Sequence, residues 1–173
     1  TIFGQDHLLK RLEPSLNQRR QSHAYLLCGP PHVGKMALAI NLAQAVNCLE
    51  GLGVPCGSCT QCERIAAGHH ADISTLAPGQ GEDGRSPKTV IGINAIKEII
   101  HRVSLKPFEG TSSVVIIDGA ESMSDDAANA LLKTLEEPPP NALFLLLTAD
   151  EDAVLPTVRS RCQSMNLIPL PNQ

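Results

Sequence analysis

The stretch from Gly29 to Lys35 has the residue types and the spacing that bind a phosphate group. It reads Gly-Pro-Pro-His-Val-Gly-Lys and directly follows a short apolar run. The spacing G-x-x-x-x-G-K between a strand and a helix is that of a phosphate-binding P-loop. Gly29 and Gly34 let backbone N–H groups turn toward one point, where the positive end of the following helix also lies. Lys35 adds a mobile positive charge for the outer phosphates, so the stretch predicts a nucleotide site, to which Pro30 also belongs.

The residue after this loop departs from the pattern. Met36 stands where a serine or threonine hydroxyl would bind Mg²⁺. A thioether is a soft, weak acceptor and a poor ligand for a hard cation. The loop therefore predicts that ATP or ADP binds, whereas Met36 predicts that Mg²⁺ is poorly held.

Four cysteines lie close together after the helix that follows the P-loop. Cys56, Cys59 and Cys62 form two overlapping C-x-x-C pairs, and Cys48 precedes them. The intervening glycines and proline allow four thiolates to converge on one zinc ion. Since protein fills all four positions and leaves none for water, we predict a structural zinc module inserted at about 48–62.

Disulfide bonds and a redox-active C-x-x-C pair are the alternatives for this cluster. A cytosolic nucleotide-binding chain keeps its thiols reduced, and a redox pair needs two cysteines instead of four. His69 and His70 follow the cluster, but we do not expect them to be ligands, because four cysteines complete the site. Cys28 lies in an apolar run and is expected to be a small core residue.

A second apolar run ends in a carboxylate. A continuous β-branched segment followed by an acid, here Asp118, is how a buried parallel strand delivers a carboxylate to the carboxyl edge of a sheet. In P-loop enzymes this aspartate belongs to the magnesium site. Gly119 follows it where many ATPases have a glutamate that orients water, and Glu121 is expected to point elsewhere. Thr148 ends a third apolar run, where it either closes the strand or senses a terminal phosphate.

The alternation of apolar runs with helical periods predicts an α/β fold. Ser124 is expected to cap a helix that a run of prolines from Pro138 stops. Segment 78–88 is rich in glycine, proline and charge and is expected to be an exposed loop. We expect strands at 24–28, 71–76, 113–118, 143–147 and 164–168, and helices at 6–18, 37–47, 91–103, 124–136 and 151–159.

The overall composition limits the class of protein. The 173 residues are 42% hydrophobic and 18% charged, which suits one α/β domain with a substantial core. A net charge of −4, with three phenylalanines, one tyrosine and no tryptophan, excludes a self-sufficient nucleic-acid binder, so contact with DNA is expected through an assembly. No apolar run is long enough to span a membrane, and a cytoplasmic location is expected.

Several motifs resemble one family over essentially the whole chain. They are Gly4-Gln5-Asp6, His23-Ala24-Tyr25-Leu26, the P-loop, the four-cysteine insert, Leu131-Leu-Lys-Thr-Leu-Glu-Glu-Pro-Pro139 and Ser160-Arg161-Cys162. Together they resemble bacterial sliding-clamp loader subunits, which are AAA+ ATPases of the DNA polymerase III holoenzyme. The gamma and tau motor subunits of that family carry threonine and an Asp-Glu pair where this chain has Met36 and Gly119. The segment 90–98 also resembles the delta-prime subunits, which the chain resembles most.

The resemblance implies a domain architecture. Residues 1–173 are expected to form the AAA+ nucleotide-binding domain, with a five-stranded parallel sheet flanked by helices and the zinc module inserted into it. The chain begins without a methionine and is expected to be the N-terminal portion of a longer subunit. Lid and collar domains would follow residue 173.

The resemblance also implies a role for Arg161, which composition alone would make a surface arginine. In the family this arginine reaches across a subunit boundary to the γ-phosphate held by a neighbour and stabilises transition-state charge there. Asp118 corresponds to the magnesium-associated acid, Thr148 to the phosphate sensor, and Cys162 to a signature residue packed under the arginine.

The function that this resemblance implies is that of a non-motor subunit. It would take part in ATP-dependent loading of the sliding clamp onto primed DNA, with its own ATPase activity defective. Its partners would be the gamma or tau and delta subunits and, through the assembly, the clamp and the primer-template DNA. Two alternatives stay open: an active gamma- or tau-like motor in which water bridges the magnesium ion, and a zinc-stapled interaction scaffold with an empty P-loop.

Overall fold

The computed structural model describes residues 23–51, 54–79 and 90–169. The predicted helix over 6–18 and most of the predicted loop over 78–88 lie outside these residues. The elements in chain order are β1 (Ala24–Cys28), α2 (Lys35–Asn47), α3 (Thr60–Ala66), β2 (Ile73–Leu76), α4 (Ile93–Ser104), β3 (Ser113–Asp118), the 3-10 turn η1 (Ala120–Ser122), α5 (Asp125–Glu136), β4 (Ala142–Thr148), the 3-10 turn η2 (Glu151–Ala153), α6 (Pro156–Arg159) and β5 (Gln163–Asn166).

The described strands form one five-stranded parallel sheet in the order β2-β3-β4-β1-β5. This confirms the predicted sheet. Cys28 pairs with Thr148, and Asp118 pairs with Leu147, so β1, β3 and β4 end level with one another. The P-loop, Asp118 and Thr148 therefore meet at the carboxyl edge of the sheet, where α/β folds bind ligands.

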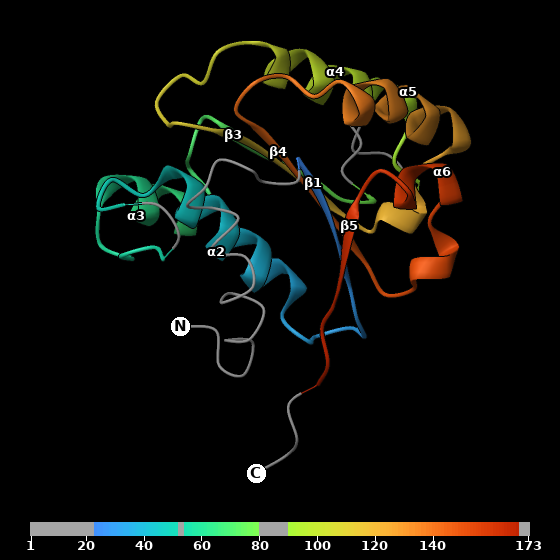
Figure 1. Ribbon diagram of the computed structural model, residues 1–173, viewed down its shortest axis with the longest axis horizontal. Coiled ribbons are helices and arrows are strands. Elements are labelled where there is room, and N and C mark those ends of the chain that lie inside the picture. Colours follow the sequence, from blue (N-terminus) through green and yellow to red (C-terminus); the bar gives the residue numbers. More distant parts are fainter. Residues whose placement is uncertain (1–22, 52–53, 80–89, 170–173) are drawn as a thin grey trace.

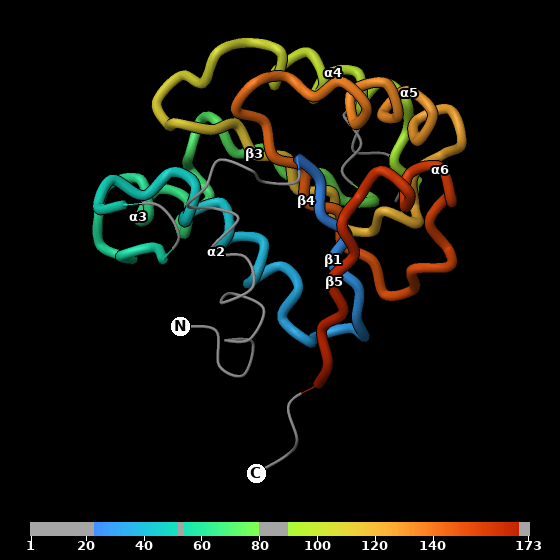
Figure 2. The backbone as a smooth tube through the Cα atoms, in the orientation of Figure 1, coloured from blue at the N-terminus to red at the C-terminus, as the bar shows by residue number. Residues whose placement is uncertain are grey.

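Helices cover both faces of the sheet, as Figures 1 and 2 show: α2 and α3 lie on one face, and α4, α5 and α6 on the other. Successive strand residues point to opposite faces. Tyr25 and Leu27 accordingly join the core under α2, whereas Ala24 and Leu26 join the core under α5. The same alternation in β3 and β4 explains why these strands are apolar at nearly every position.

The helix predicted over 151–159 is wrong, because the chain forms two short elements there. The 3-10 turn η2 ends at Ala153, and α6 begins at Pro156. Proline lacks an N–H and disfavours helical geometry in the residue before it, so it starts a helix and does not continue one. The predicted cap of α5 is confirmed, since the hydroxyl of Ser124 accepts a hydrogen bond from the Ala127 N–H at 3.1 Å.

Asp72, just before β2, holds the loop that leads into β3. Its carboxylate accepts hydrogen bonds from the backbone N–H groups of Phe108 at 2.6 Å, Glu109 at 2.9 Å and Gly110 at 2.7 Å. Burial acts to raise the pKa of Asp72, but these three donors together bring the pKa below its ordinary value. The ionised form is therefore the one that stabilises the loop.

Replacing Asp72 with asparagine should lower the free energy of unfolding at neutral pH by about 1.5–3 kcal/mol, the range for hydrogen bonds to a charged group. Because the pKa is depressed in the folded state, this stability is present above the unfolded pKa and is lost as the pH falls through the folded pKa. Denaturant unfolding at a series of pH values measures it, and Glu137→Gln, at an exposed glutamate, is the control. A penalty for Asp72→Asn that stays constant down to low pH would contradict the account.

Among the described residues, no helix combines the length and the apolar composition needed to cross a membrane.

Candidate functional site

The P-loop connects β1 to α2 in the geometry of a phosphate cradle. Gly29 has φ 157°, and a Cβ atom built on it would lie 2.7 Å from the carbonyl oxygen of Leu167, so a side chain does not fit there. Gly34 has φ 96° and is the N-cap residue directly before α2. His32 also has a positive φ, 62°, which is costly for a residue other than glycine. This conformation aims the N-terminus of α2 at the space above the loop, where an anion is favoured.

Lys35 is held by the loop that precedes it. Its Nζ donates to the carbonyl oxygen of Gly29 at 2.6 Å and to that of Pro30 at 2.8 Å. An ammonium group has three N–H donors, so one remains for a phosphate oxygen. The lysine is therefore oriented by the loop and still has a donor to offer a ligand.

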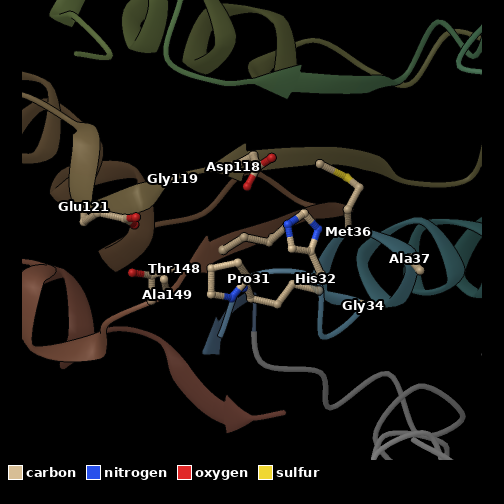
Figure 3. Close-up of a pocket in the computed structure, with 12 residues that line it drawn as sticks. Pro31, His32, Gly34, Met36, Ala37, Asp118, Gly119, Glu121, Thr148 and Ala149 are labelled. Carbon is tan, nitrogen blue, oxygen red and sulfur yellow. The ribbon is translucent and has the colours of Figure 1, made fainter. Parts of the chain in front are cut away.

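A cavity of about 480 Å³ lies in front of this loop (Figure 3). Three segments that are distant in sequence meet there: the start of α2, the end of β3 and the end of β4. The residues that line it are Pro31, His32, Gly34, Lys35, Met36, Ala37, Asp118, Gly119, Glu121, Leu147, Thr148 and Ala149. The structure thus brings Gly34, Lys35 and Met36 of the predicted nucleotide site together with Asp118 and Thr148. Pro30 lines a smaller adjacent pocket of about 220 Å³, with Val33 and Pro169 among its other walls.

Two of the side chains that line this cavity are already engaged in contacts within the protein. The side chain of Met36 packs against the apolar core under α2. The hydroxyl of Thr148 donates to the Asp150 carbonyl oxygen at 2.9 Å and accepts from the Asp150 N–H at 3.1 Å. Its proton is therefore used in the turn after β4, although the residue stands at the predicted sensor position.

The prediction that Glu121 points elsewhere is wrong, because Glu121 lines the same cavity as Asp118 (Figure 3). Gly119 adopts the left-handed conformation, with φ 81°, and the tight turn η1 follows it. That turn brings Glu121 round to the cavity. His32 is a second lining residue that was not predicted. In the sequence, the only sign that Glu121 could reach the cavity was Gly119, which directly follows Asp118 at the end of the strand.

Arg161 is not among the residues that line this cavity. It follows α6 and precedes β5, whose first residue, Gln163, pairs with Tyr25 near the start of β1. About 13 Å of strand separates Tyr25 from the P-loop, at roughly 3.3 Å per residue. Arg161 thus lies beyond the amino ends of the strands, at the edge of the sheet opposite its own P-loop.

The four cysteines predicted as ligands lie together. The sulfur atoms of Cys48, Cys56, Cys59 and Cys62 are all within 4.8 Å of one another, and none is in a disulfide. A tetrahedral zinc ion with Zn–S bonds of 2.3 Å requires sulfurs about 3.8 Å apart, so the cluster fits a single ion after a small contraction.

Backbone N–H groups prepare this cluster for a cation. Those of Ser58 and Cys59 lower the pKa of Cys56 to about 6, and the Cys59 N–H lies 3.3 Å from the Cys56 sulfur. Burial raises the pKa of Cys62 to about 12, so a bound ion has to displace its proton. The cluster could hold a metal ion, and its chemistry suits a soft or borderline ion.

His70 has a structural role. Its Nε2 is hydrogen-bonded to the side chain of Gln61, and its Nδ1 accepts from the Asp72 N–H at 3.1 Å, so both ring nitrogens are in use. Burial lowers the pKa of His70, which favours the neutral ring. Cys28 and Cys162 both contribute to the core on the α5 face, and burial raises the pKa of Cys28 to about 11 and that of Cys162 to about 12. The core prediction for Cys28 is confirmed.

A cradle, a lysine and an acid at the carboxyl edge of a five-stranded parallel sheet define a P-loop domain of the AAA+ type. Residues 4–171 match the family model described as DNA polymerase III, delta subunit. The delta' subunit of Bacillus subtilis (strain 168) is 39% identical over 166 residues, which are 96% of this chain and 48% of that protein. The tau subunit of the same organism is 37% identical over 163 residues, which are 94% of this chain and 27% of that protein.

A solved structure agrees with these matches. The DNA polymerase III gamma subunit-related protein of Thermotoga maritima superposes with a TM-score of 0.65 at 25% identity, covering 94% of this chain and 46% of that one. The chain belongs to the DNA polymerase III delta subunit family, which confirms the resemblance to its clamp-loader subunits, delta-prime among them. It spans about half the length of the delta' relative and about a quarter of the tau relative.

Proposed function

We propose that this chain is the AAA+ domain of a non-motor clamp-loader subunit, of the delta-prime kind, in a bacterial DNA polymerase III. The subunit takes part in ATP-dependent loading of the sliding clamp onto primed DNA, in a cytoplasmic complex with gamma or tau and delta subunits. Lid and collar domains follow residue 173. The names of the relatives, which are DNA polymerase III subunits, support this function.

The observation that carries the proposal is the separation of Arg161 from its own P-loop. An arginine at the amino edge of the sheet, beyond the start of β5, cannot reach a phosphate at the carboxyl edge of the same domain. Its charge is then available to a nucleotide held by a neighbouring subunit. An arginine supplied in this way stabilises the charge that develops on the transferred phosphoryl group.

The subunit's own site binds ATP or ADP through the loop glycines and Lys35, with no firm place for Mg²⁺. Met36 supplies no hydroxyl, and its apolar side chain packs partly against the core beside the cavity. Gly119 supplies no carboxylate beside Asp118. Without these groups a phosphate can be held, but attack by water on it is not organised.

One observation favours a second candidate function, an active gamma- or tau-like ATPase. Glu121 lines the cavity with Lys35, Asp118 and Thr148, so a carboxylate is present where a water could be oriented. Magnesium often keeps several waters, and a water could bridge it to the protein in place of the missing hydroxyl. Restoring the hydroxyl distinguishes the two functions.

Replacing Met36 with threonine should make nucleotide binding depend on magnesium. For the unaltered chain we expect the affinity for labelled ATP to change less than about threefold when Mg²⁺ is added, and for the variant we expect a gain of about tenfold, or 1.4 kcal/mol. Equilibrium binding with Mg²⁺ and with a chelator measures this, and Lys35→Ala controls for binding in the cradle. Strong dependence on Mg²⁺ in the unaltered chain would favour the motor, and no binding at all would favour an empty scaffold.

We also propose that the ion held by the four cysteines is structural zinc. The thiolate-rich, closed set of ligands supports this choice over magnesium or calcium, which prefer oxygen. The module is fastened to the domain by hydrogen bonds from Gln44 to the Cys62 carbonyl at 2.8 Å and from Gln61 to the Glu109 carbonyl at 3.1 Å. A zinc ion there would fix the module against α2 and the loop before β3.

A further inference from the structure

The side chain of Arg161 is held by an acid of its own chain, at the end of α5. Its Nε donates to the Oε1 atom of Glu136 at 2.8 Å, and its Nη2 donates to the same oxygen. Its Nη1 donates to the carbonyl oxygen of Thr157 at 2.7 Å and lies 3.4 Å from the hydroxyl oxygen of Ser160. All three guanidinium nitrogens therefore have partners before any ligand is present.

These contacts leave the guanidinium of Arg161 able to donate a further hydrogen bond to a ligand. Arginine has five N–H donors, and the four contacts occupy at most four of them, so at least one Nη2 N–H has no partner among residues 23–51, 54–79 and 90–169. The Arg161 side chain is 31% exposed, which places part of it at the surface. A phosphate that approaches from a neighbouring subunit can meet this free donor while Glu136 keeps its place.

We propose that Glu136 is the positioning residue for Arg161 and fixes the guanidinium in the orientation in which a neighbour's nucleotide meets it. This inference rests on the proposed function, in which Arg161 acts in trans. A long, flexible arginine loses much rotamer freedom when it is fixed, and a side chain fixed in advance does not lose that freedom at the moment of catalysis. Glu136 acts on the rate of the neighbour's reaction through Arg161, without touching the nucleotide.

The sequence itself offers a matched control. Glu137 is the next residue, carries the same charge and is exposed, but its side chain makes no ion pair with Arg161. A general effect of removing negative charge from this surface would appear at both glutamates. An effect on Arg161 would appear only at Glu136.

The experiment uses the full-length subunit in the reconstituted clamp loader, with ATP hydrolysis measured over a range of ATP concentrations. For Glu136→Ala we expect kcat to fall about tenfold with KM for ATP unchanged, because a loosened arginine stabilises the transition state less. Glu136→Gln should recover much of the rate, since its amide oxygen still accepts from Nε and Nη2. Glu137→Ala should match the unaltered loader, and thermal unfolding should be the same for all variants.

Two results overturn the inference. An unchanged kcat in Glu136→Ala shows that the arginine needs no anchor, and an increased kcat shows that Glu136 restrains the arginine instead of presenting it. The single variant Arg161→Ala, measured in the same assay, distinguishes a failure of this inference from a failure of the proposed function. If Arg161→Ala abolishes hydrolysis while Glu136→Ala changes nothing, only the inference fails. If Arg161→Ala itself changes nothing, the proposed function fails and the inference fails with it.

Discussion

Replacing Arg161 with alanine is expected to slow ATP hydrolysis at the neighbouring subunit's site by a factor of about 10³ or more, the range found for an arginine finger. The guanidinium stabilises charge that develops in the transition state, so kcat should fall and nucleotide affinity should change little. Single-turnover hydrolysis by the reconstituted clamp loader measures the effect. The subunit itself should fold normally, because Arg161 lies at the surface and its contacts are with the end of α5 and with α6.

Arg159 provides the matched control. It lies two positions earlier, carries the same charge and pairs with Asp152 at 2.7 Å instead of with Glu136. Arg159→Ala should leave hydrolysis unchanged. Arg161→Lys should recover only part of the rate, because an ammonium group cannot reproduce the planar fork of arginine. Equal losses of hydrolysis rate for Arg159→Ala and Arg161→Ala would mean that the positive charge of this surface affects hydrolysis in general, and that Arg161 has no specific role.

Loss of the metal is expected to have the largest effect on the fold. Replacing Cys62 with serine should reduce the zinc content from about one ion per chain to nearly none, and it should unfold residues 48–66. Structural zinc contributes about 10–16 kcal/mol of apparent free energy in small zinc domains, and we expect part of such a contribution to hold the module against α2. Metal analysis and hydrogen exchange of the module measure the two effects.

Cys162→Ser is the control for this substitution. Cys62 is fully buried, and Cys162 is a partly buried thiol that packs against the core under α5, far in the sequence from the four-cysteine cluster. Its variant should keep the zinc. A Cys62→Ser protein that binds no zinc but keeps the exchange protection of the module would show that packing alone maintains it. Retention of zinc by Cys62→Ser would contradict the four-cysteine site.

Much of the fold could be predicted because the strongest signals in the sequence are local. The runs in β1, β3 and β4 are apolar at nearly every position, since helices cover both sides of the sheet. The P-loop spacing and the C-x-x-C pairs depend on chain geometry over a few residues. The edge strands were harder to delimit, because β5 is largely exposed and therefore carries a weaker apolar pattern.

The parts that could not be predicted depend on contacts between distant segments. Glu121 lines the cavity in front of the P-loop because Gly119 turns the chain, and a sequence does not state the φ of its glycines. Glu136 belongs to the Leu-Lys-Thr-Leu-Glu-Glu-Pro-Pro stretch and Arg161 to the Ser-Arg-Cys triplet, and these two residues are 25 positions apart. Only the folded chain brings these two side chains into contact at one edge of the sheet.

Lys35→Ala and Arg161→Ala, each introduced only in this subunit of the reconstituted clamp loader, distinguish a subunit that acts on its neighbour's nucleotide from one that hydrolyses its own. Steady-state ATP hydrolysis is recorded with the clamp and primed DNA present. We expect the Lys35→Ala loader to hydrolyse ATP at the unaltered rate, because this subunit's own P-loop does not turn over, and the Arg161→Ala loader to lose hydrolysis at the neighbouring site. The reverse pattern, with hydrolysis lost in Lys35→Ala and kept in Arg161→Ala, would make the subunit a motor and contradict the account.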